Sequence, residues 1–140
     1  MFKFLRKLLF GEATVDERCT EIVKNKKLSV EEKCEKVIAE YKKYLREQIK
    51  NDAENLTYEV HYEEFENDGK RNERVYKHFY EESLKDIMYT QKLYFRELYF
   101  KLKRQGLKEE NVSKENLAFI TKMTDITTPP MPIIDDEREA

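Results

Sequence analysis

Two histidines are the side chains of this sequence best suited to metal or proton chemistry. His61 and His78 are the only imidazoles among the 140 residues. If residues 57–80 form a pair of strands, the pairing places both histidines on one face together with Glu59 and Glu63. Imidazole and carboxylate groups at such proximity can hold zinc, but polar cross-strand pairs account for the same four residues. We therefore expect no resident metal ion and no cofactor.

The residue patterns of the common catalytic sites are absent from the sequence. It contains no Ser, His and Asp arrangement, no HExxH or CxxC spacing and no glycine-rich phosphate loop. Cys19 and Cys34 fall on apolar helical faces, where a cysteine acts as a small hydrophobe. We expect a protein that is not an enzyme.

The composition limits the elements that could position any functional group. Of the 140 residues 40% are charged, and only six are glycine or proline, three of each. Leu, Ile, Val and Phe make up 35 residues, a share of about 25% that suffices for a thin core. So few turn-forming residues exclude many-stranded sandwiches and predict one domain of long elements.

The net charge of −2 hides four blocks of alternating sign. Residues 1–50 sum to +4, 51–82 to −6, 83–108 to +5 and 109–140 to −5. Such blocks favour internal complementarity or a surface with one basic and one acidic face. The total charge gives no reason to expect a nucleic-acid partner.

Residues 1–11 predict a separate, basic amphipathic helix that stops at Gly11. Such a helix can lie in an anionic membrane surface, dock on the core or bind a partner. The residues expected to contact a membrane are Phe2, Lys3, Phe4, Leu5, Arg6, Lys7 and Leu9. We find no signal-peptide pattern and no run of about 18 apolar residues. We expect a cytoplasmic protein, which lies at the inner face of the membrane if this helix meets lipid.

Residues 12–123 predict a single helical domain. Apolar periodicity indicates helices over Thr14–Lys26, Val30–Lys50 and Lys114–Met123. Ser29, followed three residues on by a glutamate, forms a capping box for the second of these, and Ser113 caps the third.

Residues 57–80 carry the signal of a β-hairpin. Thr57–Phe65 and Arg74–Tyr80 are rich in aromatic and β-branched residues and flank Asp68-Gly69, a sequence typical of a type I′ turn with positive φ at Gly69. The alternative continues the preceding helix to Phe65 and makes Asp68-Gly69 the loop of a helical hairpin.

Ser83 predicts the start of a helix that runs to Gln105 and stops at Gly106. Beside its main apolar face lie a basic stripe and then a second apolar patch. The basic stripe consists of Lys85, Lys92, Arg96 and Lys103, and the second patch of Tyr89, Leu93 and Phe100.

Each of these two surfaces has two interpretations. The second apolar patch could cover the hairpin, or it could bind another protein or a second copy of the chain. The basic stripe with its neighbouring tyrosines resembles surfaces that bind nucleic acid, whereas lysines that border an apolar face are usually solvated.

Residues 124–140 predict an extended acidic tail that holds all three prolines and five acidic residues. Met131, Ile133 and Ile134 in this tail could dock on a partner protein, or the tail could only solubilise the chain.

The sequence as a whole predicts a mainly α-helical fold with one β-hairpin, an α+β protein, with an all-α helical bundle as the alternative. For function we expect a small, non-catalytic accessory protein that binds another protein or regulates it. A protein that binds nucleic acid through the basic stripe is the alternative.

Overall fold

The computed structural model describes residues 13–65 and 69–126, and every regular element in these ranges is a helix. The predicted helical domain is therefore an all-α bundle, and no strand occurs in the two ranges. In chain order the elements are α2 (Val15–Lys24), α3 (Val30–Glu47), α4 (Ile49–His61), the 3-10 turn η1 (Tyr62–Phe65), α5 (Gly69–Arg104), the 3-10 turn η2 (Glu109–Asn111) and α6 (Lys114–Thr124).

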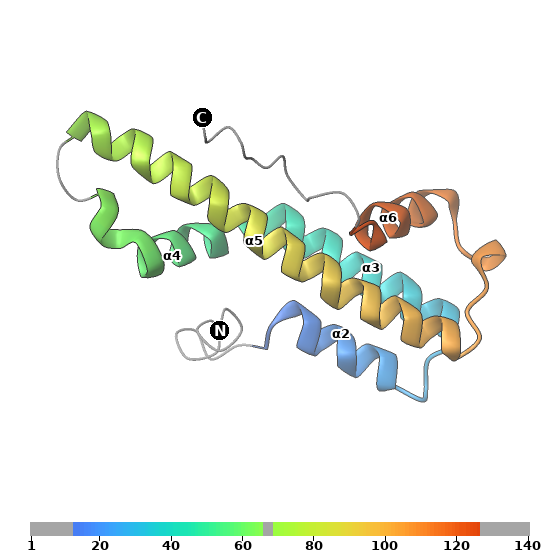
Figure 1. Cartoon of the computed structure of the whole chain (residues 1–140). Coiled ribbons are helices and arrows are strands. Elements are labelled where there is room, and N and C mark those ends of the chain that lie inside the picture. The colour runs from blue at the N-terminus through green and yellow to red at the C-terminus, as the bar shows by residue number, and fades with distance from the viewer. Residues whose placement is uncertain (1–12, 66–68, 127–140) are drawn as a thin grey trace.

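Helix α5 is the axis on which the other elements pack. Its 36 residues make it about 54 Å long. In Figure 1, α4 and η1 lie along its N-terminal half, and α3 lies along its C-terminal half with α2 and α6 to either side. Helices α3 and α5 are antiparallel, because Lys33 contacts Gln105 while Tyr41 meets Phe95, further back along α5.

One continuous hydrophobic core joins these helices. Tyr41 of α3 is fully buried and meets the Phe95 ring edge-on, with the ring centroids 5.3 Å apart. Phe95 in turn contacts Phe119 of α6. The other buried side chains of this core come from α2, α3, α4, α5, α6 and the turn after α5, and include Val15, Cys19, Val23, Cys34, Val37, Ile38, Ile49, Ala53, Ile87, Leu98, Leu102, Leu107, Ile120 and Met123.

The β-hairpin predicted near residues 57–80 is wrong. The first predicted arm ends α4 and forms η1, and the second lies inside α5. Gly69 begins α5 as a helical residue, so the positive φ that a type I′ turn requires is not adopted there. The all-α alternative is confirmed, but the helix before Phe65 is broken at Gln48 and Gly69 belongs to α5 and not to a loop.

The reason lies in which side chains the fold buries. In α4, Ile49, Ala53 and Thr57 are buried at intervals of four residues, which is a helical spacing. Tyr58 and Val60, which a paired strand would bury on one face, are 48% and 50% exposed. The aromatic residues that suggested strands instead pack side by side between α4, η1 and α5. These rings belong to Tyr58, Phe65, Tyr76 and Tyr80.

The predicted caps at Ser29 and Ser113 are confirmed, and Thr14 also forms a capping box. The long α3 prediction overshoots, because Gln48 leaves helical geometry with φ −124° and separates α3 from α4. Ser83 is not a cap, because α5 begins fourteen residues earlier and the Ser83 side chain is buried within it.

Gly106 ends α5 as predicted, with a positive φ of 107°. The amide of Leu107 donates to the carbonyl of Leu102 at 3.1 Å, and that of Gly106 to Lys103 at 3.0 Å. These two bonds are those of a Schellman motif, in which the residue after the helix takes a conformation that glycine adopts without strain.

Candidate functional site

Helix α5 leaves a row of side chains exposed in its C-terminal half. Tyr89, Leu93 and Phe100, the residues of the predicted second patch, are 40%, 38% and 40% exposed. Together with Arg96 they recur at intervals of four, three and four residues, which aligns them on one side of the helix. We call these four residues the α5 stripe. The interpretation that this patch covers a β-hairpin is wrong, because residues 57–65 and 69–80 form no hairpin strands.

The predicted basic stripe borders the α5 stripe, and its cations interact with groups of the same chain. The guanidinium of Arg96 lies over the Phe100 ring, 4.9 Å from its centroid. The ammonium of Lys103 lies 5.6 Å from the Tyr99 ring centroid and 3.5 Å from a Glu109 carboxylate oxygen. Both cations therefore rest on aromatic surface, and one is also paired with an acid.

Lys85 and Lys92 also have partners within the chain. Lys85 Nζ lies 3.6 Å from Glu82 Oε2, one turn earlier in α5, and Lys92 Nζ donates to the carbonyl of Asp125 at 3.4 Å. A phosphate backbone is bound by cations that face outward and release counterions. All four basic residues have a partner within the chain, so any anion that binds this surface must compete with these contacts.

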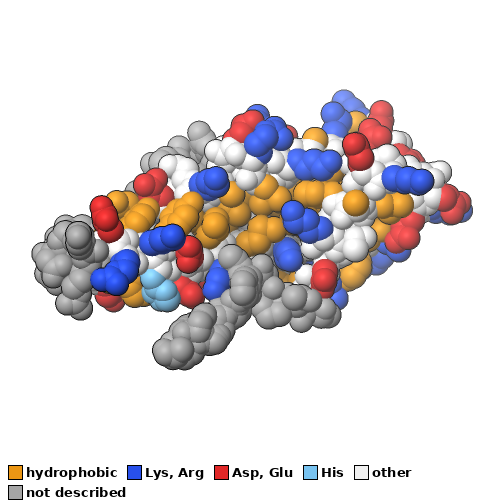
Figure 2. All heavy atoms as spheres, turned by 90° about the horizontal axis from the view of Figure 1, so that it is seen from above, with side chains coloured by type: hydrophobic (Ala, Val, Ile, Leu, Met, Phe, Trp, Pro, Cys, Tyr) orange, Lys and Arg blue, Asp and Glu red, His pale blue; other side chains and the backbone are white. Residues whose placement is uncertain are grey.

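A second apolar surface is a groove of about 360 Å³ between α3, α4, α5 and α6. Its apolar lining is Leu45, Ile49, Leu84 and Met88, and its cations are Lys50, Lys92 and Lys122. Figure 2 shows one face of the molecule, on which hydrophobic side chains gather in a band that Lys and Arg border and interrupt. We call the groove lined by these seven residues the lysine-rimmed groove.

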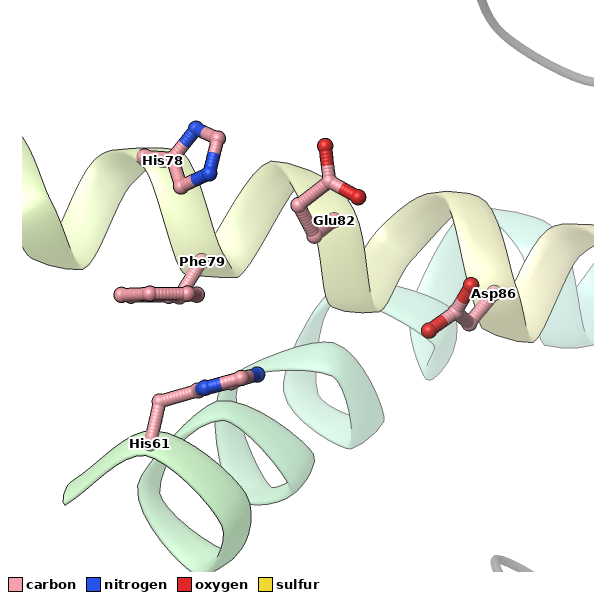
Figure 3. A pocket seen from close by; sticks show the side chains of 5 residues that line it. All are labelled: His61, His78, Phe79, Glu82 and Asp86. Carbon is pink, nitrogen blue, oxygen red and sulfur yellow. The ribbon is translucent and has the colours of Figure 1, made fainter. Parts of the chain in front are cut away.

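A third hollow, of about 690 Å³, lies where α4 faces the N-terminal half of α5. It brings His61 and His78 together, but its acids are Glu82 and Asp86 and not the predicted Glu59 and Glu63. Figure 3 shows the His61 ring parallel to that of Phe79. Their centroids are 3.9 Å apart, so packing fixes this imidazole.

The electrostatics of this hollow are modest. His61 Nδ1 lies 3.8 Å from Glu64 Oε1. Burial, and then the neighbouring Glu82, raise the pKa of the Asp86 carboxyl, while His61 and Lys85 oppose that change. Within residues 13–65 and 69–126, no cluster of three or more His, Cys, Asp or Glu side chains has the geometry of a metal site.

The two cysteines are free thiols buried in the core. Burial raises the pKa of the Cys19 thiol to about 12 and that of Cys34 to about 11. Since a thiolate is the nucleophilic form, neither thiol is activated for chemistry.

The remaining predicted site residues lie outside the described ranges. These are the membrane-contact residues Phe2, Lys3, Phe4, Leu5, Arg6, Lys7 and Leu9, and the tail residues Met131, Ile133 and Ile134.

The lysine-rimmed groove is a feature that sequence reasoning missed. Leu45, Ile49, Leu84 and Met88 read as core positions on their own helices, and each is apolar at a core spacing. These side chains form an open groove only because α3 and α4 cross α5. The helical wheel of a single segment therefore could not predict the groove.

Comparisons of this chain with known proteins gave no match. No family model, curated protein or solved structure matches it. In the part of the chain that the structure describes, no helix is both long and apolar enough to cross a bilayer. The fold is that of a helical bundle, and its candidate functional sites are the exposed surfaces described above.

Proposed function

We propose that this protein is a non-catalytic interaction protein, and that the α5 stripe binds an acidic amphipathic helix of another protein. The observation that carries the proposal is the exposure of Tyr89, Leu93 and Phe100 on one side of a long, well-anchored helix. Exposed aromatic and apolar side chains that align in this way are typical of binding surfaces.

The spacing supports a helical partner. Intervals of four, three and four residues are those of the seam along which two helices pack. From Tyr89 to Phe100 the seam extends over about 16 Å, or three turns of α5. The core side of α5 fixes its position, because Phe95 and Leu102 are each 1% exposed.

The charge around the stripe supports an acidic partner and disfavours a second copy. Lys85, Lys92 and Lys103 border the stripe along one edge, and Arg96 lies within it. A second copy docked on the same surface would bring these cations close to their own equivalents. Glutamates that flank an apolar seam on the partner would instead meet opposite charge.

A peptide-binding experiment tests the proposal. The probe is a fluorescent, designed amphipathic helix with leucines along its seam and glutamates beside them, and the matched probe has lysines in place of the glutamates. We expect fluorescence anisotropy to report binding of the acidic probe only, and Leu93→Glu to abolish it. The matched control variant is Val60→Glu, which places the same charge at an exposed apolar position of α4.

Either a binding result or an oligomeric state would overturn the proposal. One is equal loss of binding in Leu93→Glu and Val60→Glu, or no binding of the acidic probe at all. The other is a dimer in light scattering that Leu93→Glu dissociates, which would assign the stripe to a second copy. Labelled single-stranded and duplex DNA, titrated at two salt concentrations, serves as the probe for the nucleic-acid alternative.

A contact with the membrane surface is a second proposed function, and it rests on residues 1–10. Their alternation of phenylalanine and leucine with Lys3, Arg6 and Lys7 is that of an interfacial helix. A single short helix binds reversibly, so it would act as a peripheral anchor. We expect the full chain to co-sediment with phosphatidylserine vesicles. A chain that lacks residues 1–10 should remain in the supernatant. Equal sedimentation of both chains would contradict this role.

A further inference from the structure

We propose that the lysine-rimmed groove is occupied by the chain's own C-terminal segment, residues 127–137. Its Met131, Ile133 and Ile134 would fill the apolar part, and the acids that follow them would pair with the lysines. The proposal does not depend on the α5 stripe, because the basic stripe separates the α5 stripe from the groove on the surface of α5.

The first support is the place where the described chain ends. Helix α6 closes with Asp125 as its C-cap, and the Asp125 carbonyl accepts a hydrogen bond from Lys92 at 3.4 Å. Lys92 and Lys122, the latter in the last turn of α6, both line the groove. The chain therefore leaves α6 at the edge of the groove.

The length of the following segment also suffices. Six residues from Asp125 to Met131 span up to about 20 Å when extended. Eight residues of α5, from Lys92 to Leu84, rise by about 12 Å. Met131 and the residues after it can thus reach any point along the groove without strain on α6.

The chemistry of the segment matches that of the groove. Three prolines among residues 129–132 stiffen the chain in an extended form and so reduce the entropy lost on docking. Met131, Ile133 and Ile134 suit the lining of Leu45, Ile49, Leu84 and Met88. Asp135, Asp136 and Glu137 come directly after them and suit the rim of Lys50, Lys92 and Lys122.

Tethering favours this occupant over a foreign peptide of the same chemistry. A segment joined by a short linker to the edge of its site has an effective concentration in the millimolar range. A free acidic peptide must reach that concentration to compete. The groove is therefore a self-contact site, and any external ligand must first displace the tail.

Paramagnetic broadening of methyl resonances in the full chain tests this contact. A nitroxide is attached at Arg138→Cys, and the buried Cys19 and Cys34 react slowly because their pKa values are raised. We expect the methyl signals of Leu84, Met88 and Ile49 to lose most of their intensity. Those of Val23, in α2, should stay sharp.

The matched control carries the same label in a chain with Ile133→Asp and Ile134→Asp, and the broadening should then disappear. Asp135→Lys with Asp136→Lys should weaken it. Unchanged broadening in the aspartate variant, or equal broadening at Val23, would overturn the proposal. So would broadening in a mixture of spin-labelled and isotope-labelled chains, since that result assigns the contact to a second molecule.

Discussion

The hydroxyl groups of Thr57 and Ser83 share a hydrogen bond of 3.0 Å at the buried crossing of α4 and α5. Both side chains are almost fully buried, at 0% and 2% exposure. The Thr57 hydroxyl also lies 2.7 Å from the carbonyl of Ala53, one turn earlier in α4. The pair therefore links α4 to α5. From the sequence, Thr57 was expected in a strand and Ser83 at the start of a helix.

This link predicts a coupled loss of stability. Thr57→Val and Ser83→Ala should each lower the free energy of unfolding by about 1 kcal/mol, because each removes the buried hydrogen bond between the two helices. The double variant should lose less than the sum, since it removes both hydroxyls. Urea unfolding of the four chains measures the coupling. Strict additivity would show that the two hydroxyls do not interact.

Alanine substitutions at two glycines test whether residue 69 is helical or lies in a β-turn. Gly106→Ala should destabilise the protein by about 1–2 kcal/mol, because Gly106 has a φ of 107° and alanine is strained in that backbone conformation. No atom lies within 4 Å of the added methyl group. Gly69→Ala should be neutral or should stabilise by up to about 1 kcal/mol, since residue 69 is helical.

Thermal unfolding of the two glycine variants gives the comparison. A type I′ turn would reverse the result at Gly69, because alanine is strained at positive φ. Destabilisation by Gly69→Ala equal to that by Gly106→Ala would contradict the start of α5.

The helices with strong local signals were predictable from the sequence. The hydroxyl groups of Ser29 and Ser113 each accept a hydrogen bond from a backbone amide in the first turn of the helix. These bonds form within one segment and need no tertiary contact. Gly106 likewise acts through its own φ. Such features depend on a few neighbouring residues, so one sequence contains all of the information that they need.

Residues 57–80 were mispredicted because their local preferences disagree with their tertiary contacts. Tyr58, Tyr76 and Tyr80 favour strands, yet their rings are placed to pack between helices. Gly69, which suggested a turn, instead begins α5. The lysine-rimmed groove was not predicted for a related reason, since it exists only where separate helices cross. The α5 stripe was predictable because one helix contains all of it.

Two tyrosines of α3 predict opposite effects of the same substitution. The hydroxyl of Tyr41 is buried and has no hydrogen-bond partner among the described residues. Tyr41→Phe removes an unsatisfied group, so it should leave the free energy of unfolding unchanged or raise it. The hydroxyl of Tyr44 instead donates to Asp52 Oδ2 at 2.8 Å.

Tyr44→Phe should therefore lower stability by about 1.5–3 kcal/mol, because it deprives a buried carboxyl of a donor. Each variant removes one oxygen from a tyrosine that is 2% exposed or less, so the two are matched in size and burial. Denaturant melts of both chains check the difference. A loss in Tyr41→Phe as large as that in Tyr44→Phe would mean that the Tyr41 hydroxyl has a partner after all.

The buried thiols predict a loss of stability at alkaline pH. Burial raises the pKa of Cys19 to about 12 and of Cys34 to about 11 in the fold, whereas an unfolded thiol ionises near about 8.5. Above that pH the unfolded chain releases protons that the folded chain keeps, so stability falls as the pH rises. Each thiol should contribute a loss of about 1.4 kcal/mol per pH unit until its folded pKa is reached.

Urea unfolding between pH 7.5 and 9.5 should show this slope before the tyrosines ionise near about pH 10. The chain with Cys19→Ala and Cys34→Ala is less stable at every pH because it loses buried volume, but its slope in this window should be shallower. The difference in slope between the two chains isolates the thiols from every other titrating group. Parallel slopes would show that the cysteines ionise as readily in the fold as in the unfolded chain.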